Sequence, residues 1–203
     1  MFRFQKHNLC IQLDIVKYFA AQALVIIEYL QSNNIIYRDI KPENFIVEFE
    51  TGKLKLVDFG FAKELNFKTS NSKNRGRTYT KCGTPEYMAP EIIQQKELNS
   101  TETRVSQSSF LSKQLGYGMG CDIWSWGVLL CELIGGYNPF TSSNIQTTFE
   151  NILGLNINWP KNITKQCKDL LQTVLVTDPN LRASMQDIKK HTFFRDVNWP
   201  DLE

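Results

Sequence analysis

The residues from Cys121 to Ile134 constrain the fold most strongly, because they predict a helix with apolar side chains on almost every side. A helix without a polar face is stable only in the centre of a domain, with other elements packed around it. Gly135 and Gly136 follow directly and predict its end. A chain of 203 residues is long enough for one such core and short for two. We therefore expect one domain built around this helix.

The rest of the chain predicts further helices and a few short strands. Apolar residues recur at helical spacing between Asp14 and Gln31, with Asp14 as the candidate N-cap. The other predicted helices are 144–153, 163–176 and 184–191, and the predicted strands are 35–36, 45–49 and 54–57, with a turn at Thr51 and Gly52. The strands are too short for a large sheet. The predicted fold class is therefore mostly α with short β ribbons (α+β).

Two polar stretches interrupt this order. Residues 66–77 are polar and basic, and residues 94–114 are rich in Ser, Thr, Gln and Glu. Both lack apolar periodicity, which predicts mobile loops. Neither is expected to separate two folding units, so we interpret them as insertions within one domain.

Charge and cysteine content exclude several classes of function. A net charge of +2 gives no argument for binding nucleic acid or a membrane surface. Five scattered cysteines without a C-x-x-C pair argue against a disulfide framework and a zinc site, and favour a reducing compartment. The longest apolar runs end at Glu28 and Glu132, so no transmembrane segment is expected. We expect a cytoplasmic protein without nucleic-acid or membrane partners.

The run Tyr37-Arg38-Asp39-Ile40-Lys41-Pro42-Glu43-Asn44, followed at residues 58–60 by Asp-Phe-Gly, carries the chemistry. Asp39 can orient a hydroxyl group and accept its proton, and Lys41 can neutralise charge on a phosphoryl group. The amide oxygen of Asn44 and the carboxylate of Asp58 suit magnesium. A lone D-x-K is usually a surface turn. The whole run at this spacing instead predicts phosphoryl transfer.

These motifs resemble the large C-terminal lobe of a eukaryotic serine/threonine protein kinase. The chain is most similar to the cyclic-nucleotide-dependent members of the AGC group, in which Tyr commonly replaces His at the position of Tyr37. Further similar segments are 58–63, 77–91, 136–140, 187–191 and 193–194. The resemblance covers the chain apart from the two polar insertions. It implies a protein-kinase-like fold, with residues 1–203 forming the C-terminal lobe, a catalytic loop at 37–44 and an activation segment at 58–91.

The resemblance implies transfer of the γ-phosphoryl group of ATP to Ser or Thr in the presence of Mg²⁺. Thr84 matches the residue whose hydroxyl bridges the catalytic Asp and Lys in this family, which favours Ser and Thr substrates. The implied catalytic residues are Asp39, Lys41, Asn44 and Thr84; the implied ATP-binding residues are Lys41, Glu43, Asn44 and Asp58; and the implied metal ligands are Asn44 and Asp58.

The resemblance also implies a phosphorylation switch. Thr80 occupies the position that is phosphorylated in this group, and Arg38 and Lys63 match two of its basic partners. A phosphate there adds about −1.5 to −2 charges at neutral pH and can order a loop through such partners. An upstream activating kinase is an expected partner. The alternative is an unmodified, exposed threonine.

The expected substrates are proteins with basic residues before the phospho-acceptor. Glu43 and Glu132 match positions that pair with an arginine two residues before the acceptor, and a bidentate contact would make this preference geometric. The alternative is a solvated or core-paired glutamate. Lys81 departs from the family, because a large apolar residue usually helps to form the pocket after the acceptor.

Several residues are expected to support the site without contacting ATP. Asp122 resembles a buried aspartate that holds the catalytic-loop backbone, and Glu91 and Arg182 resemble an internal ion pair that braces the activation segment. Such pairs are costly to break singly. Cys82 is either a reactive thiol or, more simply, a small passive side chain.

Some parts of a complete kinase site are not recognisable in the sequence. No G-x-G-x-x-G loop occurs, and no Val-Ala-Ile-Lys-like strand precedes the catalytic loop. We therefore expect that the small N-terminal lobe is missing, that this polypeptide alone has negligible kinase activity, and that Ile46 and Phe59 lie exposed on the cleft floor. The alternative function is that of a noncatalytic, truncated lobe that binds substrates or regulators.

Overall fold

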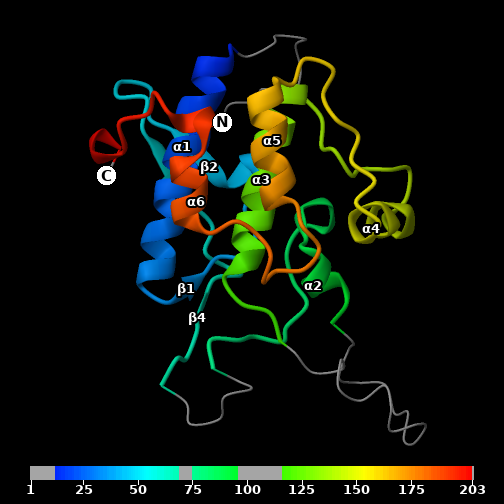
Figure 1. Cartoon of the computed structure of the whole chain (residues 1–203). Helices are drawn as coiled ribbons and strands as arrows, with labels where there is room; N and C mark the ends of the chain where they lie inside the picture. Colours follow the sequence, from blue (N-terminus) through cyan, green and yellow to red (C-terminus); the bar gives the residue numbers. More distant parts are fainter. Residues whose placement is uncertain (1–11, 69–74, 96–115, 203) are drawn as a thin grey trace, which may run out of the picture.

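The computed structural model describes residues 12–68, 75–95 and 116–202, and its centre is one buried helix. Helix α3 (Gly120–Gly135) lies in the middle, with α1 (Leu13–Ser32) and α5 (Lys165–Val174) packed against it (Figure 1). Every residue from Cys121 to Glu132 is buried. At the C-terminal end, Gly136 has a φ of 73°, a left-handed conformation that glycine adopts easily. The prediction of a central helix that ends at the two glycines is confirmed.

Helix α1 begins two residues earlier than the candidate cap implied. The carbonyl oxygen of Gln12 accepts hydrogen bonds from the N–H groups of Ile15 (3.0 Å) and Val16 (3.1 Å), so Asp14 already lies in the first turn. The prediction of Asp14 as the N-cap is therefore wrong. A carboxylate in the first turn still interacts favourably with the helix dipole. Further along, the indole N–H of Trp126 in α3 donates to the carbonyl oxygen of Ala20 (2.9 Å), which joins the two helices.

The described strands form two small antiparallel ribbons. Strand β1 (Ile35–Ile36) pairs with β4 (Lys63–Glu64), and β2 (Phe45–Val47) pairs with β3 (Leu54–Leu56). The three predicted strands are confirmed, with the later two shorter than expected. The pattern did not predict β4, because its two residues are charged and exposed. The fold class, mostly α with short β ribbons, is confirmed.

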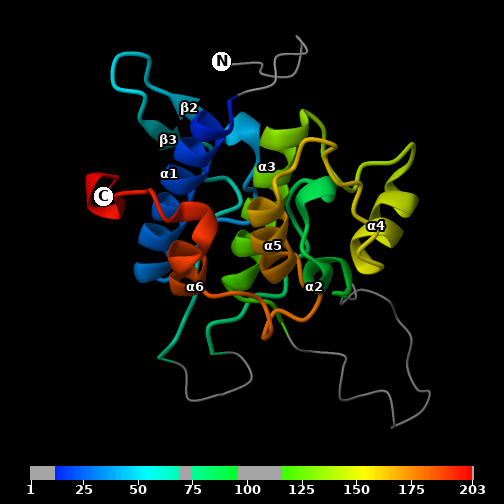
Figure 2. The same cartoon turned by 45° about the horizontal axis from the view of Figure 1, so that its top comes forward.

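The C-terminal helices follow the predicted order and lie around α3 (Figure 2). Asn144, Thr164 and Ser184 each accept a backbone N–H at a helix start, as N-caps do. The helices after α3 are α4 (Ile145–Leu153), α5 and α6 (Met185–Lys190), and the short helices are α2 (Pro90–Ile93), η1 (Pro42–Asn44), η2 (Pro85–Tyr87), η4 (Thr192–Phe194) and η5 (Trp199–Asp201). Helix α2 was not predicted, since four residues carry too little periodicity.

The two polar insertions are described only in part. Residues 69–74 and 96–114 lie outside the described residues, and so does most of the prediction of mobile loops. The described ends are well connected. The N–H of Gly76 donates to the carbonyl oxygen of Asn66 (2.9 Å), and a side-chain N–H of Arg77 donates to the carbonyl oxygen of Gly116 (2.6 Å).

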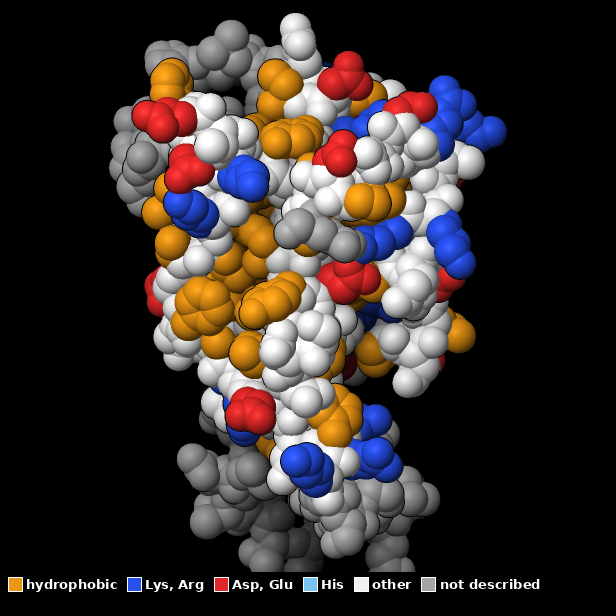
Figure 3. All heavy atoms as spheres, turned by 90° about the vertical axis from the view of Figure 1, so that its left-hand side faces the viewer, with side chains coloured by type: hydrophobic (Ala, Val, Ile, Leu, Met, Phe, Trp, Pro, Cys, Tyr) orange, Lys and Arg blue, Asp and Glu red, His pale blue; other side chains and the backbone are white. Residues whose placement is uncertain are grey.

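Hydrophobic side chains also occur on the surface of the molecule. Figure 3 shows a face on which they gather along one side, with Lys, Arg, Asp and Glu side chains spread over the rest. Ile46 and Phe59 are each 50% exposed, as expected for the cleft floor. Within the described part of the chain, no helix is both long and apolar enough to cross a membrane.

Candidate active site

The carboxylate of Asp39 lies at the centre of a compact polar cluster beside η1. It is almost fully buried and accepts hydrogen bonds at both oxygens. Oδ1 accepts from the hydroxyl (2.7 Å) and the N–H (3.1 Å) of Thr84. Oδ2 accepts from the amide nitrogen of Asn44 (2.9 Å) and pairs with the ammonium of Lys41 (2.8 Å). The ammonium also donates to the hydroxyl of Thr84 (2.8 Å), which therefore bridges Lys41 and Asp39.

These contacts fix the charge of Asp39. Burial raises the pKa of its carboxyl, but the hydrogen bonds from Lys41, Thr84 and Asn44 outweigh burial and hold the pKa below the usual value. The carboxylate is therefore ionised at neutral pH. An ionised, fixed carboxylate can orient a hydroxyl group and accept its proton.

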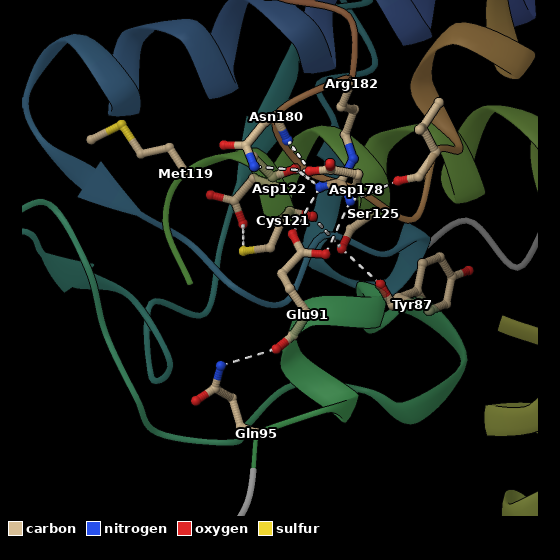
Figure 4. Close-up of polar contacts among 12 residues, drawn as sticks. Tyr87, Glu91, Gln95, Met119, Cys121, Asp122, Ser125, Asp178, Asn180 and Arg182 are labelled. Atoms are coloured by element: carbon tan, nitrogen blue, oxygen red, sulfur yellow. Dashed lines mark hydrogen bonds and ion pairs between the residues drawn. The ribbon is translucent and has the colours of Figure 1, made fainter. Parts of the chain in front are cut away.

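Asp122, in α3, holds the backbone of the predicted catalytic loop. Its carboxylate accepts the N–H groups of Tyr37 and Arg38, each at 2.8 Å. Arg38 has a φ of 71°, a strained conformation for a residue other than glycine, and these bonds help to stabilise it. Asp122 lies next to Cys121 in the interior (Figure 4). Burial raises the pKa of Asp122 to about 6, although the two N–H donors favour the charged form.

This raised pKa predicts a measurable pH dependence of stability. Between the ordinary pKa and about 6, the folded state binds a proton more tightly than the unfolded state, so this group makes the protein less stable as pH rises through that window. The expected fall is about 3 kcal/mol at most. In Asp122→Asn the side chain cannot ionise, and this fall should disappear. Urea unfolding of both proteins between pH 4 and 7 measures the difference in slope.

The slope is the relevant quantity in that comparison, because asparagine also turns an N–H₂ group toward a backbone N–H and lowers stability at every pH. The carboxylates with lowered pKa values, such as Asp39 and Asp187, contribute equally to both proteins. Parallel curves for the two proteins would contradict the prediction.

Asp58 lies in a loop that Tyr37 holds in place. The phenol of Tyr37 is buried, donates to the carbonyl oxygen of Val57 and lies 2.9 Å from that of Asp58. The N–H of Val57 donates to the carbonyl oxygen of Asn44 (2.9 Å), so the two predicted metal ligands come from adjoining segments. Asp58 has a φ of 60° and an exposed carboxylate. This strained backbone presents the carboxylate to solvent beside the Asp39 cluster.

The donor set of these two residues suits a magnesium–nucleotide complex. The amide nitrogen of Asn44 donates to the carboxylate and the carbonyl oxygen (2.8 Å) of Asp39, which leaves the amide oxygen as the ligand atom. Magnesium prefers hard oxygen ligands and takes few from the protein when phosphates and water complete its shell. No group of three or more metal-ligating side chains occurs within residues 12–68, 75–95 and 116–202. The two oxygen donors of Asn44 and Asp58 fit magnesium held jointly with a phosphate.

An acidic cavity of about 620 Å³ opens beside Thr84. Glu43 and Glu132, the two predicted substrate-binding residues, both line it. Glu132 is nearly buried and accepts a hydrogen bond from the phenol of Tyr87, whose pKa burial raises. Glu86 is a third carboxylate that sequence analysis missed. Its position just after Thr84 and Pro85 was the available signal. The lining residues are Glu43, Thr84, Glu86, Tyr87, Glu132, Tyr137, Asn138, Thr141 and Asn158.

Thr80 lies exposed on the predicted activation segment, and its two predicted basic partners contact other residues of that segment. The ammonium of Lys63 donates to the hydroxyl of Thr78 (3.2 Å), and Nε of Arg38 donates to the carbonyl oxygen of Phe61 (2.6 Å). In the described part of the chain, neither cation is hydrogen-bonded to the Thr80 hydroxyl. Lys81 extends over the ring of Phe149 in α4, 5.2 Å from its centroid.

Glu91 and Arg182 form a buried, bidentate ion pair that connects α2 to the segment before α6 (Figure 4). The two N–H···O distances are 2.8 and 3.0 Å. The guanidinium also donates to the carbonyl oxygens of Gly120 (2.6 Å) and Val176 (3.0 Å) and lies over the ring of Trp124. Arg182 therefore joins α2, α3 and the segment between α5 and α6. The predicted ion pair is confirmed, and its bracing role stays a prediction.

Comparison with known proteins places this site in a family. The sequence matches the protein kinase domain over residues 1–194. It is 37% identical over 190 residues to the cAMP-dependent protein kinase catalytic subunit PRKX of Mus musculus, which covers 91% of this chain and 45% of that protein. It is 36% identical to the cAMP-dependent protein kinase type 3 of Saccharomyces cerevisiae (93% of this chain, 41% of that protein). It is 38% identical to the cAMP-dependent protein kinase catalytic subunit of Schizosaccharomyces pombe (93% of this chain, 32% of that protein).

The chain thus spans less than half the length of these relatives. The match to the domain nevertheless covers nearly all of its residues, including those of the predicted catalytic loop and the predicted activation segment. The relatives are cAMP-dependent kinases, as the resemblance in the catalytic loop predicted. This chain belongs to the protein kinase domain family, and within it to the AGC-like serine/threonine kinases.

Proposed function

We propose that this chain forms the catalytic-loop side of a protein kinase that transfers the γ-phosphoryl group of ATP to serine or threonine. The observation that carries the proposal is the ionised carboxylate of Asp39, held by Lys41, Asn44 and Thr84 at hydrogen-bond distance. Phosphoryl transfer depends mainly on positioning and charge stabilisation, and this cluster supplies both without rearrangement.

Each residue has a separate task in this proposal. Asp39 orients the acceptor hydroxyl and accepts its proton, and Lys41 balances charge on the transferred group. Glu43, within the same loop, belongs with the nucleotide- and substrate-binding residues. Asn44 and Asp58 hold Mg²⁺, which, when bound, neutralises charge on the nucleotide phosphates. The bridging hydroxyl of Thr84 fits a small hydroxyl acceptor, such as Ser or Thr.

The acidic cavity supports substrates with basic residues before the acceptor. Glu43, Glu86 and Glu132 bring three carboxylates to one cavity that also includes Thr84. An arginine can form bidentate, charge-assisted hydrogen bonds with such groups. Because Glu132 is nearly buried, a contact with it is less screened by solvent than a surface ion pair.

Regulation and location belong to the same proposal. The exposed Thr80 is accessible to an upstream kinase, and a phosphate there would lie near Arg38 and Lys63, which contact the same segment. The four cysteines in the described residues are free thiols, which fits a reducing cytoplasm.

A noncatalytic binding module is the second candidate function. The preformed acidic cavity favours it, because binding a basic peptide there requires neither nucleotide nor proton transfer. The two functions differ in one respect. A binding module retains peptide without phosphorylating it, even when nucleotide and magnesium are present.

Peptide phosphorylation tests the proposal. Because the 203 residues contain no glycine-rich loop, the assay uses this chain joined to the small lobe of the mouse relative. We expect Mg²⁺-dependent phosphorylation of a serine peptide with arginines before the acceptor. Glu132→Gln should raise KM for this peptide by about tenfold with little change in kcat, because it removes binding to a remote charge. Glu150→Gln, on the exposed side of α4, is the matched control and should change neither.

One outcome would overturn the proposed kinase activity, and another only the basic-residue preference. Binding of the arginine peptide without phosphorylation would favour the binding module. Equal phosphorylation of peptides with arginine and alanine before the acceptor would remove the basic-residue preference while retaining the kinase activity.

A further inference from the structure

Tyr117 is a buried tyrosine for which the proposed reaction has no use. Its side chain is almost fully buried, and burial raises its pKa, so the phenol remains a hydrogen-bond donor. The phenol donates to the carbonyl oxygen of Thr80. It also lies 3.4 Å from Nη1 of Arg38 and 3.7 Å from the sulfur of Cys82. We call these contacts the Tyr117 junction: the Tyr117 phenol with Arg38, the Thr80 carbonyl and the Cys82 thiol.

The backbone of Tyr117 is fixed to the same part of the activation segment. Tyr117 and Thr78 exchange two backbone hydrogen bonds of 2.9 Å each, and the buried hydroxyl of Thr78 accepts from Lys63. The two segments approach so closely that a Cβ atom on Gly116 would lie 2.6 Å from the carbonyl oxygen of Thr78. Backbone and side chain of Tyr117 thus both contact residues 78–82.

Arg38 brings the catalytic loop to this junction. It immediately precedes Asp39, and its N–H is bound by Asp122. Its carbonyl oxygen faces Gly83, where a Cβ atom would lie only 2.5 Å away, and its Nε donates to the carbonyl oxygen of Phe61. Arg38 therefore contacts the activation segment near its start and near Thr84, and reaches the Thr80 carbonyl through Tyr117.

We propose that Tyr117 is a positioning residue that couples the catalytic loop to residues 78–82 of the activation segment. Four residues of chain reach at most about 14 Å, so the place where Thr80 is held limits where Thr84 can meet Asp39. Tyr117 fixes the Thr80 carbonyl and Arg38 with one phenol. If Tyr117 couples these segments, a change at Thr80 reaches the catalytic loop through Tyr117. This consequence rests on the proposed function, in which Thr80 is phosphorylated.

Tyr117→Phe tests the coupling in the intact chain, without nucleotide, because it keeps the ring and removes only the phenol oxygen. We expect about tenfold faster alkylation of Cys82 by iodoacetamide, followed by mass spectrometry of its peptide, because a hydrogen-bonded neighbour is lost. The amides of Arg38 and Thr84, which are bound by Asp122 and Asp39, should also exchange with solvent several-fold faster. An effect on Arg38 is not expected if Tyr117 only anchors the segment.

Tyr29→Phe is the matched control. It removes an exposed phenol on α1 that does not belong to the Tyr117 junction, and should leave both rates unchanged. Arg38→Lys removes the guanidinium that contacts the Tyr117 phenol, so it should also speed alkylation of Cys82. If the coupling is real, adding Arg38→Lys to Tyr117→Phe has little further effect, because both changes break the same contact.

Two results would overturn the coupling. Unchanged alkylation of Cys82 in a folded Tyr117→Phe protein would show that the junction does not hold the segment. Faster alkylation of Cys82 with unchanged amide exchange at Arg38 would show that Tyr117 holds only the segment around Thr80. Independent effects of Tyr117→Phe and Arg38→Lys would show the same. Should Tyr117→Phe fail to fold, the alkylation rate of Cys82 in Arg38→Lys alone tests the coupling. An unchanged rate in that variant would contradict it. None of these measurements requires phosphoryl transfer, so failure of the peptide assay would overturn the proposed function and leave the coupling standing.

Discussion

Asp39→Asn is expected to slow phosphorylation of the arginine peptide by about 10²- to 10⁴-fold, the range for loss of a general base. The ionised carboxylate is removed, and the geometry is disturbed as well. Each oxygen of Asp39 accepts two donors, from Thr84 at Oδ1 and from Asn44 and Lys41 at Oδ2. An amide N–H₂ in place of either oxygen faces two donors and cannot accept from them. The single-turnover rate, with the small lobe supplied, measures the loss.

Binding of Mg²⁺–ATP separates the chemical step from folding. Asp58 and the Asn44 oxygen are unchanged in this variant, so calorimetry should show an affinity within a few-fold of the unmodified protein. Asp178→Asn replaces an exposed carboxylate that contacts only the loop around Asn180 in the described structure, and it serves as the control with an unchanged rate. A loss of less than about tenfold in Asp39→Asn would contradict the role of this carboxylate as the base.

The fold was predictable where the pattern of side chains alone decides it. A helical run with apolar side chains on almost every side, such as 121–134, is stable only when buried, and the structure places it at the centre. Prediction failed where the outcome depends on partners distant in sequence. Strand β4 is Lys63 and Glu64, two charged residues that form a strand because they pair with β1. The start of α1 depends on which carbonyl oxygen accepts the first helical hydrogen bonds. That oxygen belongs to Gln12, so Gln12 and not Asp14 is the N-cap.

The site divides in the same way. Asp39, Lys41 and Asn44 are close in sequence, so their motif predicts their proximity. The position of Thr84 on Asp39 follows from the path of the activation segment, and only the family resemblance indicated it. Tyr117 was missed because it follows a polar stretch and has no motif of its own. Its importance becomes visible only when Thr78, Thr80 and Arg38 are placed around it.

Arg182→Met is expected to lower the free energy of unfolding by about 3–5 kcal/mol, the cost of removing one partner of a buried ion pair. The guanidinium is almost inaccessible to solvent, and the carboxylate of Glu91 is only 12% exposed, so water cannot replace the lost partner fully. The change also leaves the carbonyl oxygens of Gly120 and Val176 without these donors. Urea unfolding followed by circular dichroism measures the difference.

A second change distinguishes an unpaired charge from lost packing. In Glu91→Gln with Arg182→Met the orphan charge is gone, so the double variant should be more stable than Arg182→Met alone, although each single change is destabilising. Arg195→Met is the matched control. Arg195 pairs with Asp196 at 3.5 Å, but both side chains are about two-thirds exposed, and the expected loss is below about 1 kcal/mol. A similar loss in Arg182→Met and Arg195→Met would show that the buried pair does not brace the activation segment, since the two differ chiefly in access to solvent.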